Sequence, residues 1–137
     1  MIQTITIKEL TEALDGRLLC GDCSTEIATL SFDSRQIGKQ TLYVPLFGEH
    51  VDGHRFIGSA FENGAAAVLT AKGEIIDRTK PHIQVKDTKA ALQSAGFCFR
   101  RKKSLPVIGI TGSVGKTTTR SLIAEALSAG KTVFQTR

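Results

Sequence analysis

The segment Pro106-Val-Ile-Gly-Ile-Thr-Gly-Ser-Val-Gly-Lys-Thr-Thr-Thr119 decides the fold. Its apolar run at residues 107–110 predicts a buried strand, residues 111–115 predict a tight loop, and residues 116–129 favour a helix. A strand, a glycine-rich loop and a helix in this order are the structural context of a phosphate-binding loop. The segment therefore predicts an α/β protein that binds a polyphosphate.

The residue types in this loop suit ATP and Mg²⁺. Gly112 and Gly115 can adopt positive φ and let the backbone N–H groups approach phosphates closely. Lys116 can place its ammonium between the β and γ phosphates, which makes it the candidate catalytic residue, and the Thr117 hydroxyl can ligate Mg²⁺. The residues expected to bind ATP are Gly112, Ser113, Val114, Gly115, Lys116, Thr117 and Thr118.

One position departs from the general pattern G-x-x-x-x-G-K-[ST]. That pattern has glycine at position 110, where this chain has Ile110. The alternative interpretation is a glycine-rich turn in which Lys116 is merely solvated. We favour the phosphate loop because a lysine in the first helical turn opposes the helix dipole, so a turn selected only for stability would more often carry an acid or a capping residue there.

Composition and charge narrow the classes of protein. With 41% hydrophobic and 23% charged residues, the chain has the composition of a globular protein, which excludes disordered and fibrous classes. The net charge of +5 suits an anionic ligand as well as nucleic acid. The basic run at residues 100–103 has no interleaved aromatic residues, so we interpret it as a solvated helix end and expect no nucleic-acid partner.

Other features indicate where the protein works. No apolar run reaches the length of a membrane span, and the first residues lack the layout of a signal peptide. Cys20 and Cys23 have metal or redox spacing, but neither Cys98 nor the three histidines are spaced to complete a zinc site. We therefore expect unpaired thiols and a cytoplasmic location. Separately, we expect a monomer.

The first 85 residues predict a compact α/β unit. Thr6 and Glu9 have the spacing of a capping box, so a helix is expected after Thr6, ending near Gly16. Another helix is expected at residues 53–64, and a third from Asp87 or Thr88 into the basic run. Strands are expected at residues 17–20, 27–32, 41–46, 65–70 and 82–85.

These elements suggest two domains. We expect a small N-terminal α/β substrate domain at residues 1–84 and the start of a phosphate-loop domain with a parallel sheet at residues 85–137. The second part predicts strand, loop, helix and strand, the last at residues 131–135. Because one such unit leaves a sheet edge without a partner, we expect the chain to be truncated, a fragment of a longer protein.

Several segments resemble the Mur ligase family. Thr111-Gly-Ser-Val-Gly-Lys-Thr-Thr118 is similar to that family's variant of the phosphate loop, including the missing glycine at position 110. The N-terminal part is similar in an ordered series, which reads Phe32-Asp-Ser-Arg35, Leu42-Tyr-Val-Pro-Leu-Phe-Gly-Glu49, Asp52-Gly-His-Arg-Phe56 and Ala60-Phe-Glu-Asn-Gly-Ala-Ala66. The series most resembles the branch of the family that adds a dipeptide to the precursor.

The resemblance implies an ATP-dependent, amide-forming ligase of peptidoglycan precursor synthesis. In such enzymes ATP phosphorylates the carboxylate of a UDP-N-acetylmuramoyl tripeptide, and the amine of D-alanyl-D-alanine attacks the acyl phosphate. The resemblance also implies that the N-terminal domain holds the UDP end of the substrate and that the next domain binds ATP and Mg²⁺. Taken alone, the chain is expected to be inactive in ligation.

The same resemblance implies a UDP site at Ser34, Arg35, Gly48, Glu49, His50, Asp52, Gly53 and His54. From spacing alone, Asp33 to Arg35 also fits a turn in which Asp33 and Ser34 bond their own backbone and Arg35 is solvated. Asp52 likewise fits a helix cap. Position 47, often lysine in the family, is Phe47 here, so the resemblance carries no phosphate contact to it.

Three other functions stay open at this point. One is a sister Mur ligase that adds a different amino acid. Another is a relative of folylpolyglutamate synthase, against which the segments around Ser34 and Gly53 argue. The last is a non-catalytic nucleotide-binding module.

Overall fold

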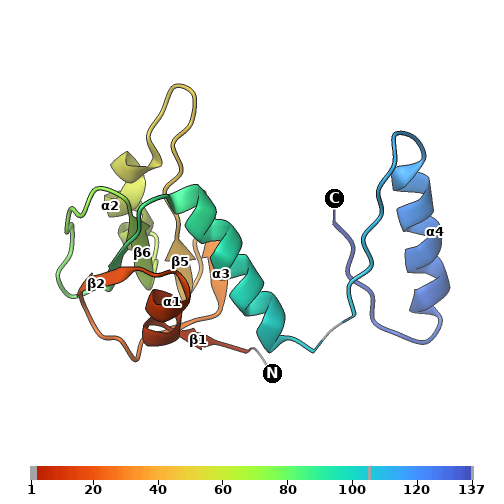
Figure 1. The fold of residues 1–137 in the computed structure, drawn as a ribbon, viewed down its shortest axis with the longest axis horizontal. Coiled ribbons are helices and arrows are strands. Elements are labelled where there is room, and N and C mark those ends of the chain that lie inside the picture. The colour runs from red at the N-terminus through yellow and green to blue at the C-terminus, as the bar shows by residue number, and fades with distance from the viewer. Residues whose placement is uncertain (1–2, 105, 137) are drawn as a thin grey trace. The chain divides into compact units, whose positions relative to one another are not determined.

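The computed structural model describes residues 3–104 and 106–136. The chain divides into two compact units, Met1–Ser104 and Leu105–Arg137 (Figure 1). No helix in the described residues is long and apolar enough to cross a membrane.

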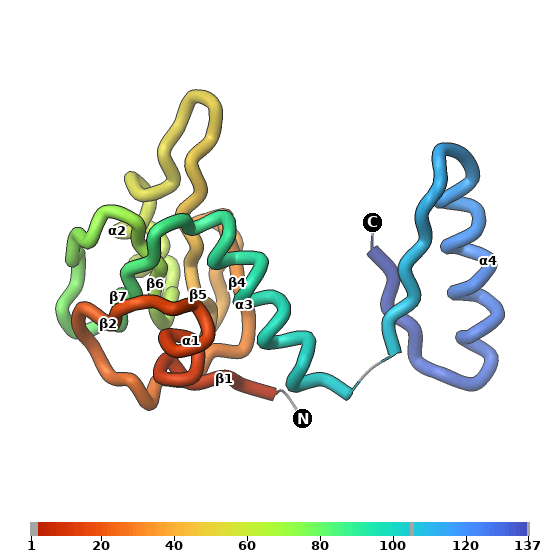
Figure 2. The backbone as a smooth tube through the Cα atoms, viewed as in Figure 1, coloured from red at the N-terminus to blue at the C-terminus, as the bar shows by residue number. Residues whose placement is uncertain are grey.

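A five-stranded sheet forms the centre of the first unit. Its strands are β2 (Arg17–Cys20), β7 (His82–Gln84), β6 (Ala67–Thr70), β5 (Thr41–Tyr43) and β4 (Thr29–Ser31), in this spatial order (Figure 2). Strands β4, β5, β6 and β7 run parallel, and β2 pairs antiparallel with β7. This confirms the predicted α/β class; the mostly parallel order of the strands in this first unit is a finding of the structure.

Helices cover both faces of this sheet. α1 (Ile7–Ala13) and α3 (Thr88–Lys102) pack on one face, where Leu42 and Leu69 point into a shared core. α2 (Ile57–Glu62), which continues the short 3-10 helix η1 (Gly53–Phe56), packs on the other face against Tyr43 and Val68. Successive residues of a strand point to opposite faces, so the buried sequences of β5 and β6 supply both cores.

The predicted capping box at the start of α1 is confirmed. The Glu9 N–H donates to Thr6 Oγ1 at 3.2 Å, and the Thr6 N–H donates to Glu9 Oε2 at 2.9 Å. Lys102, in the last turn of α3, donates to the same carboxylate at 2.9 Å. The hydrogen bond from the Thr6 backbone and the one from Lys102 lower the pKa of Glu9 to about 2.

The apolar run at residues 27–32 forms two strands where the sequence predicts one. β3 (Glu26–Ile27) pairs antiparallel with β1 (Ile5–Thr6), a strand that the sequence pattern does not predict, and only β4 joins the main sheet. Between them the Ala28 N–H donates to the Gln40 carbonyl at 2.8 Å. The chain therefore changes pairing partner at Ala28, a tertiary effect that local periodicity does not contain.

The expected domain boundary after residue 84 differs from the observed division. Ala91 and Ala95 of α3 are buried in the same core as Ile83 of β7. Because the apolar face of α3 packs on the sheet, the first unit extends to Ser104. The binding roles expected of the two parts stay predictions.

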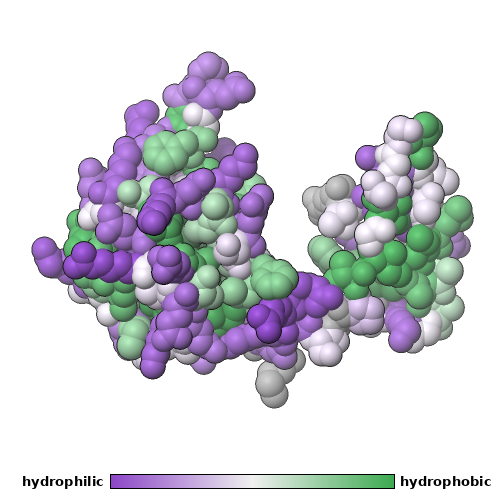
Figure 3. Space-filling model, viewed as in Figure 1, coloured by the Kyte–Doolittle hydropathy of each residue, from purple (hydrophilic) through white to green (hydrophobic). Residues whose placement is uncertain are grey.

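The second unit contains α4 (Lys116–Ser128), as predicted. The runs at residues 107–110 and 131–135 are expected to be strands, but neither is hydrogen-bonded as a strand within described residues 106–136. A strand needs a paired neighbour, and this part of the chain supplies none for either run. Their apolar side chains are accordingly exposed, Val107 by 67% and Phe134 by 92%. Figure 3 shows apolar surface on this unit.

Candidate functional site

The expected UDP residues follow neighbouring parallel strands of the sheet. Ser34 and Arg35 come directly after β4, and residues 48–54 come after β5. The carboxyl ends of parallel strands meet at one edge of a sheet, where α/β proteins ordinarily bind ligands. The structure therefore places both expected segments at the same edge, which we call the carboxyl edge.

The turn after β4 exposes a guanidinium. Asp33 Oδ1 accepts a hydrogen bond from the Arg35 N–H at 2.9 Å, and the Arg35 side chain pairs with Asp33 Oδ2 at 2.9 Å. The hydrogen bonds from Arg35 lower the pKa of Asp33. The side chain of Arg35 is nevertheless 87% exposed, and the Ser34 carbonyl accepts from Asn63 Nδ2 at 2.7 Å. The local turn and an accessible Arg35 are thus both present.

The segment after β5 forms a hairpin that projects from the sheet (Figure 1). Phe47 pairs with Asp52 in an antiparallel bridge, and the Gly48 N–H donates to the Val51 carbonyl at 2.8 Å. Glu49 and His50 fill the turn between them and are exposed. Both residues are expected at the UDP site. Within the described part of the chain, their side chains form no hydrogen bond that a ligand would have to displace.

His54 fastens the base of this hairpin to the next strand. Asp52 Oδ1 accepts from the His54 N–H at 3.0 Å and lies 2.7 Å from Nδ1. Nε2 accepts from the Ala71 N–H at 3.0 Å, so the ring proton lies on Nδ1 and faces Asp52. Asp52 also caps η1, which confirms the predicted cap. Both ring nitrogens of His54 are therefore already bonded within the protein. A direct contact of His54 with a ligand stays a prediction.

Two further residues support the hairpin from below. Gly53 packs so closely that an added Cβ would lie 2.8 Å from the backbone N and O of Leu46. The buried Tyr43 hydroxyl donates to the Gly53 carbonyl at 2.9 Å. Burial, followed by the negative charges of Asp33 and Asp52, raises the pKa of Tyr43. The hydroxyl therefore stays protonated and serves as a donor that fixes the hairpin.

Lys72 is a residue of this edge that the sequence patterns do not single out. It follows β6, and its Nζ lies 2.5 Å from Asp52 Oδ2 and 6.0 Å from the centre of the Phe47 ring. Burial acts to raise the pKa of Asp52, but hydrogen bonds from Lys72 and His54 outweigh it and hold that pKa well below its usual range. The one feature of the sequence that could have pointed to Lys72 is its place two residues after the apolar run that forms β6.

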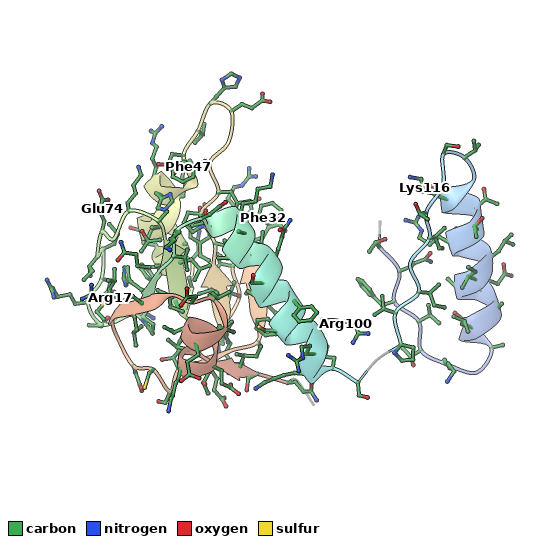
Figure 4. The ribbon with its side chains drawn as sticks, viewed as in Figure 1. Arg17, Phe32, Phe47, Glu74, Arg100 and Lys116 are labelled. Atoms are coloured by element: carbon green, nitrogen blue, oxygen red, sulfur yellow. The ribbon has the colours of Figure 1, made fainter. Side chains whose placement is uncertain are left out.

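The phosphate loop of the second unit has the backbone that its glycines predict. Gly112 has a φ of 150° and Gly115 a φ of 79°, both in the region that favours glycine. Gly115 is the N-cap of α4, no side chain caps this end, and no acid lies in the first turn. Lys116 begins the helix (Figure 4) and is exposed, as are the other expected ATP residues.

These features fit a polyphosphate. The uncapped first turn of α4 offers backbone N–H groups and the positive end of the helix dipole. No group of three His, Cys, Asp or Glu side chains that could hold a metal ion occurs in the described residues. A Mg²⁺ at this loop would therefore depend on Thr117 and on the phosphates themselves.

Comparison with known proteins decides the family. Residues 26–96 match the model described as Mur ligase family, catalytic domain. The chain belongs to the Mur ligase family. This confirms the expectation drawn from the phosphate loop and the N-terminal series.

Within the Mur ligase family, curated relatives with two different activities are similar to this chain. The UDP-N-acetylmuramoyl-tripeptide–D-alanyl-D-alanine ligase of Synechocystis is 41% identical over 81% of this chain and 25% of its own length. The UDP-N-acetylmuramoyl-L-alanyl-D-glutamate–2,6-diaminopimelate ligase of Chlorobium phaeobacteroides is 41% identical over 77% of this chain and 22% of its own. The chain thus spans about a quarter of the length of these curated relatives.

Two solved structures show the same fold. The UDP-N-acetylmuramoylalanyl-D-glutamyl-2,6-diaminopimelate–D-alanyl-D-alanyl ligase of Acinetobacter baumannii has a TM-score of 0.78 at 31% identity, over 94% of this chain and 29% of its own. The MurF ligase of Thermotoga maritima, solved with ADP, has a TM-score of 0.67 at 29% identity, over 80% of this chain and 25% of its own.

Proposed function

We propose that this chain carries the UDP-substrate domain and the start of the ATP-binding domain of a Mur ligase that adds D-alanyl-D-alanine to a UDP-N-acetylmuramoyl tripeptide. The observation that carries the proposal is the likeness, over 94% of the chain and at 31% identity, to the Acinetobacter ligase of that activity. A cytoplasmic location and a monomeric state belong to the same proposal.

In the first unit, the carboxyl edge holds the UDP end of the substrate. Arg35 reaches the diphosphate with its exposed guanidinium, and Ser34 offers a hydroxyl beside it. The hairpin residues Gly48, Glu49, His50, Asp52, Gly53 and His54 form the neighbouring wall of this site. Its rigid base, fixed by Tyr43 and His54, keeps that wall in place before the substrate arrives.

In the second unit, the loop at residues 112–118 holds the ATP phosphates. Backbone N–H groups bind the phosphate oxygens and Lys116 neutralises their charge, while Thr117 would hold a Mg²⁺ that adds further positive charge there. Phosphoryl transfer of this kind depends on positioning and charge neutralisation more than on covalent chemistry by the protein. The ADP bound in the solved Thermotoga ligase supports a nucleotide site in the family.

The reaction joins the two substrates in two steps. The carboxylate of the UDP-linked tripeptide attacks the γ-phosphoryl group of ATP, which gives an acyl phosphate and ADP. The amine of D-alanyl-D-alanine then attacks the acyl carbon, loses a proton and expels inorganic phosphate to form the amide. Because the chain spans about a quarter of its relatives' length, we expect ligation from the whole enzyme and not from these residues alone.

A sister ligase that adds 2,6-diaminopimelate is the second candidate, favoured by the equal identity of 41% to the Chlorobium ligase. A phosphate-release assay on the whole enzyme separates the two. Release that requires the UDP-linked tripeptide and D-alanyl-D-alanine is the expected result. Release with the UDP-linked dipeptide and diaminopimelate would favour the sister activity, and release with neither pair would favour a non-catalytic nucleotide-binding module.

A further inference from the structure

Phe47 is an exposed aromatic side chain held in a fixed place. The residues that precede it, Tyr43, Val44 and Pro45, are buried, whereas Phe47 is 60% exposed. Its ring centre lies 5.0 Å from that of His54, whose two nitrogens are bonded to Asp52 and Ala71. Figure 4 places Phe47 at the base of the projecting hairpin. The ring is thus accessible from solvent but braced by a rigid neighbour.

Lys72 places a cation beside the same ring. Its Nζ lies 6.0 Å from the centre of the Phe47 ring, within the range of a cation–π contact. Asp52 Oδ2 holds the ammonium at 2.5 Å, while the side chain of Lys72 is still 45% exposed. An ammonium has three donors, so the pair with Asp52 leaves donors for another acceptor.

Together the two side chains match the two ends of a nucleotide. A nucleobase offers a flat face that stacks on an aromatic ring, and phosphates offer oxygens that accept from an ammonium. A single ribose separates base from phosphate, which suits a ring and a cation whose centres lie 6.0 Å apart. Both residues also belong to the carboxyl edge, where an α/β sheet binds its ligands.

We propose that Phe47 stacks on the pyrimidine ring of the UDP group and that Lys72 contacts its diphosphate. This inference rests on the proposed function and adds two residues to its UDP site. It also assigns a role to Asp52, which positions the Lys72 ammonium over the ring. The alternative is local packing, in which the pair only stiffens the hairpin.

The chain also contains a matched control for the general effect of removing an exposed aromatic ring. Phe97 on α3 is 63% exposed, and Arg101 lies 5.9 Å from the centre of its ring. Phe97 and Arg101 therefore reproduce the exposure and the cation–π contact of the proposed pair, but they lie along α3 and outside the carboxyl edge. A general effect of removing an exposed aromatic ring would appear at Phe97 as well.

The experiment is a calorimetric titration of the 137-residue chain with UDP and, separately, with uridine. Phe47→Ala is expected to weaken binding of both probes by about tenfold, because stacking on one base contributes about 1–3 kcal/mol. Lys72→Met should weaken UDP by about tenfold and leave uridine unchanged. Phe97→Ala should change neither, and Lys72→Arg should retain UDP binding. Phe47→Leu keeps an apolar side chain at this position but has no aromatic ring to stack on a base. Weaker binding in this variant as well would therefore not be caused by misfolding.

The outcomes separate this inference from the function on which it rests. If the unchanged chain binds UDP and both Phe47→Ala and Lys72→Met bind it equally well, the inference is wrong and the UDP-linked substrate stands. An equal loss of uridine and UDP in Lys72→Met would also overturn the diphosphate contact. If the unchanged chain binds no UDP, both the inference and the proposed UDP domain fail.

Discussion

The N–H of Ala71 donates a hydrogen bond of 3.0 Å to Nε2 of His54, and this bond ties the hairpin after β5 to the end of β6. The opposite ring nitrogen faces Asp52 of the same hairpin at 2.7 Å, so one imidazole joins two segments of the carboxyl edge. Because His54 is 9% exposed, water replaces neither bond easily. The histidine that resembles a ligand residue in the sequence acts first as a brace.

Replacing His54 should therefore destabilise the first unit. His54→Ala leaves the Ala71 N–H without its acceptor and opens a cavity under Phe47, so we expect a loss of about 2 kcal/mol in the free energy of unfolding. Chemical denaturation followed by circular dichroism measures this loss. His50→Ala, in the exposed turn of the same hairpin, is the control and should change stability by less than about 0.5 kcal/mol. Equal denaturation midpoints for His54→Ala and His50→Ala would contradict the stabilising role of the His54 hydrogen bonds.

Two glycines of neighbouring elements should respond to alanine in opposite directions. An added Cβ at Gly53 meets the Leu46 backbone at 2.8 Å, so Gly53→Ala should cost about 1–3 kcal/mol. Gly58 lies inside α2 and has nothing within 4 Å of an added Cβ, so Gly58→Ala should stabilise by about 0.5–1 kcal/mol. Thermal unfolding of the two variants checks the prediction. Destabilisation by Gly58→Ala would show that the close approach at Gly53 is not what separates them.

The capping box predicts an acid-sensitive stability. The pKa of Glu9 falls from 4.5 to about 2 on folding, so its ionised form stabilises the native state at higher pH. This contribution is present above pH 4.5 and is lost as the pH falls toward 2. Glu9→Gln should lower stability measurably at neutral pH and by less in strong acid. Denaturation at several pH values measures it, with Glu12→Gln on the same helix as control; a constant difference across pH would contradict this role of Glu9.

The loop glycine should matter for nucleotide binding more than for folding. Gly115 has a φ of 79°, so Gly115→Ala forces an L-residue into the left-handed region at a cost of about 1–2 kcal/mol. We expect Mg-ATP to bind about tenfold more weakly. Gly130→Ala, just after α4 and with nothing within 4 Å of an added Cβ, is the control and should bind as the unchanged chain does. Unaltered binding by Gly115→Ala would mean that the loop conformation does not form the site.

Local patterns predict the features that depend on near neighbours in the chain. The capping box of Thr6 and Glu9, the cap at Asp52 and the helix after Gly115 each follow from spacings of a few residues. The run of apolar residues in β5 also marks a buried strand locally. Such elements can be predicted from the amino-acid sequence alone, because all the groups that form them lie within one short segment.

Where the structure differs from the sequence-based predictions, the cause is pairing or packing between segments that lie far apart in the chain. The split at Ala28 depends on β1, which lies more than about 20 residues earlier, and the reach of the first unit to Ser104 depends on how α3 packs. Lys72 escapes sequence-based prediction for the same reason, because its link to Asp52 joins two different strand ends. The strands expected around α4 require partners that described residues 106–136 do not supply.

The most direct test of the central claim, two binding sites in two units, is an amide chemical-shift titration of this chain. We predict that the UDP-N-acetylmuramoyl tripeptide shifts Ser34, Arg35 and residues 48–54, that excess UDP reverses those shifts, and that Mg-ATP shifts residues 112–118. The contrary result is silence at Ser34, Arg35 and residues 48–54 while residues 112–118 respond to Mg-ATP. In that case the UDP site is wrong, and the chain is better described as a nucleotide-binding module.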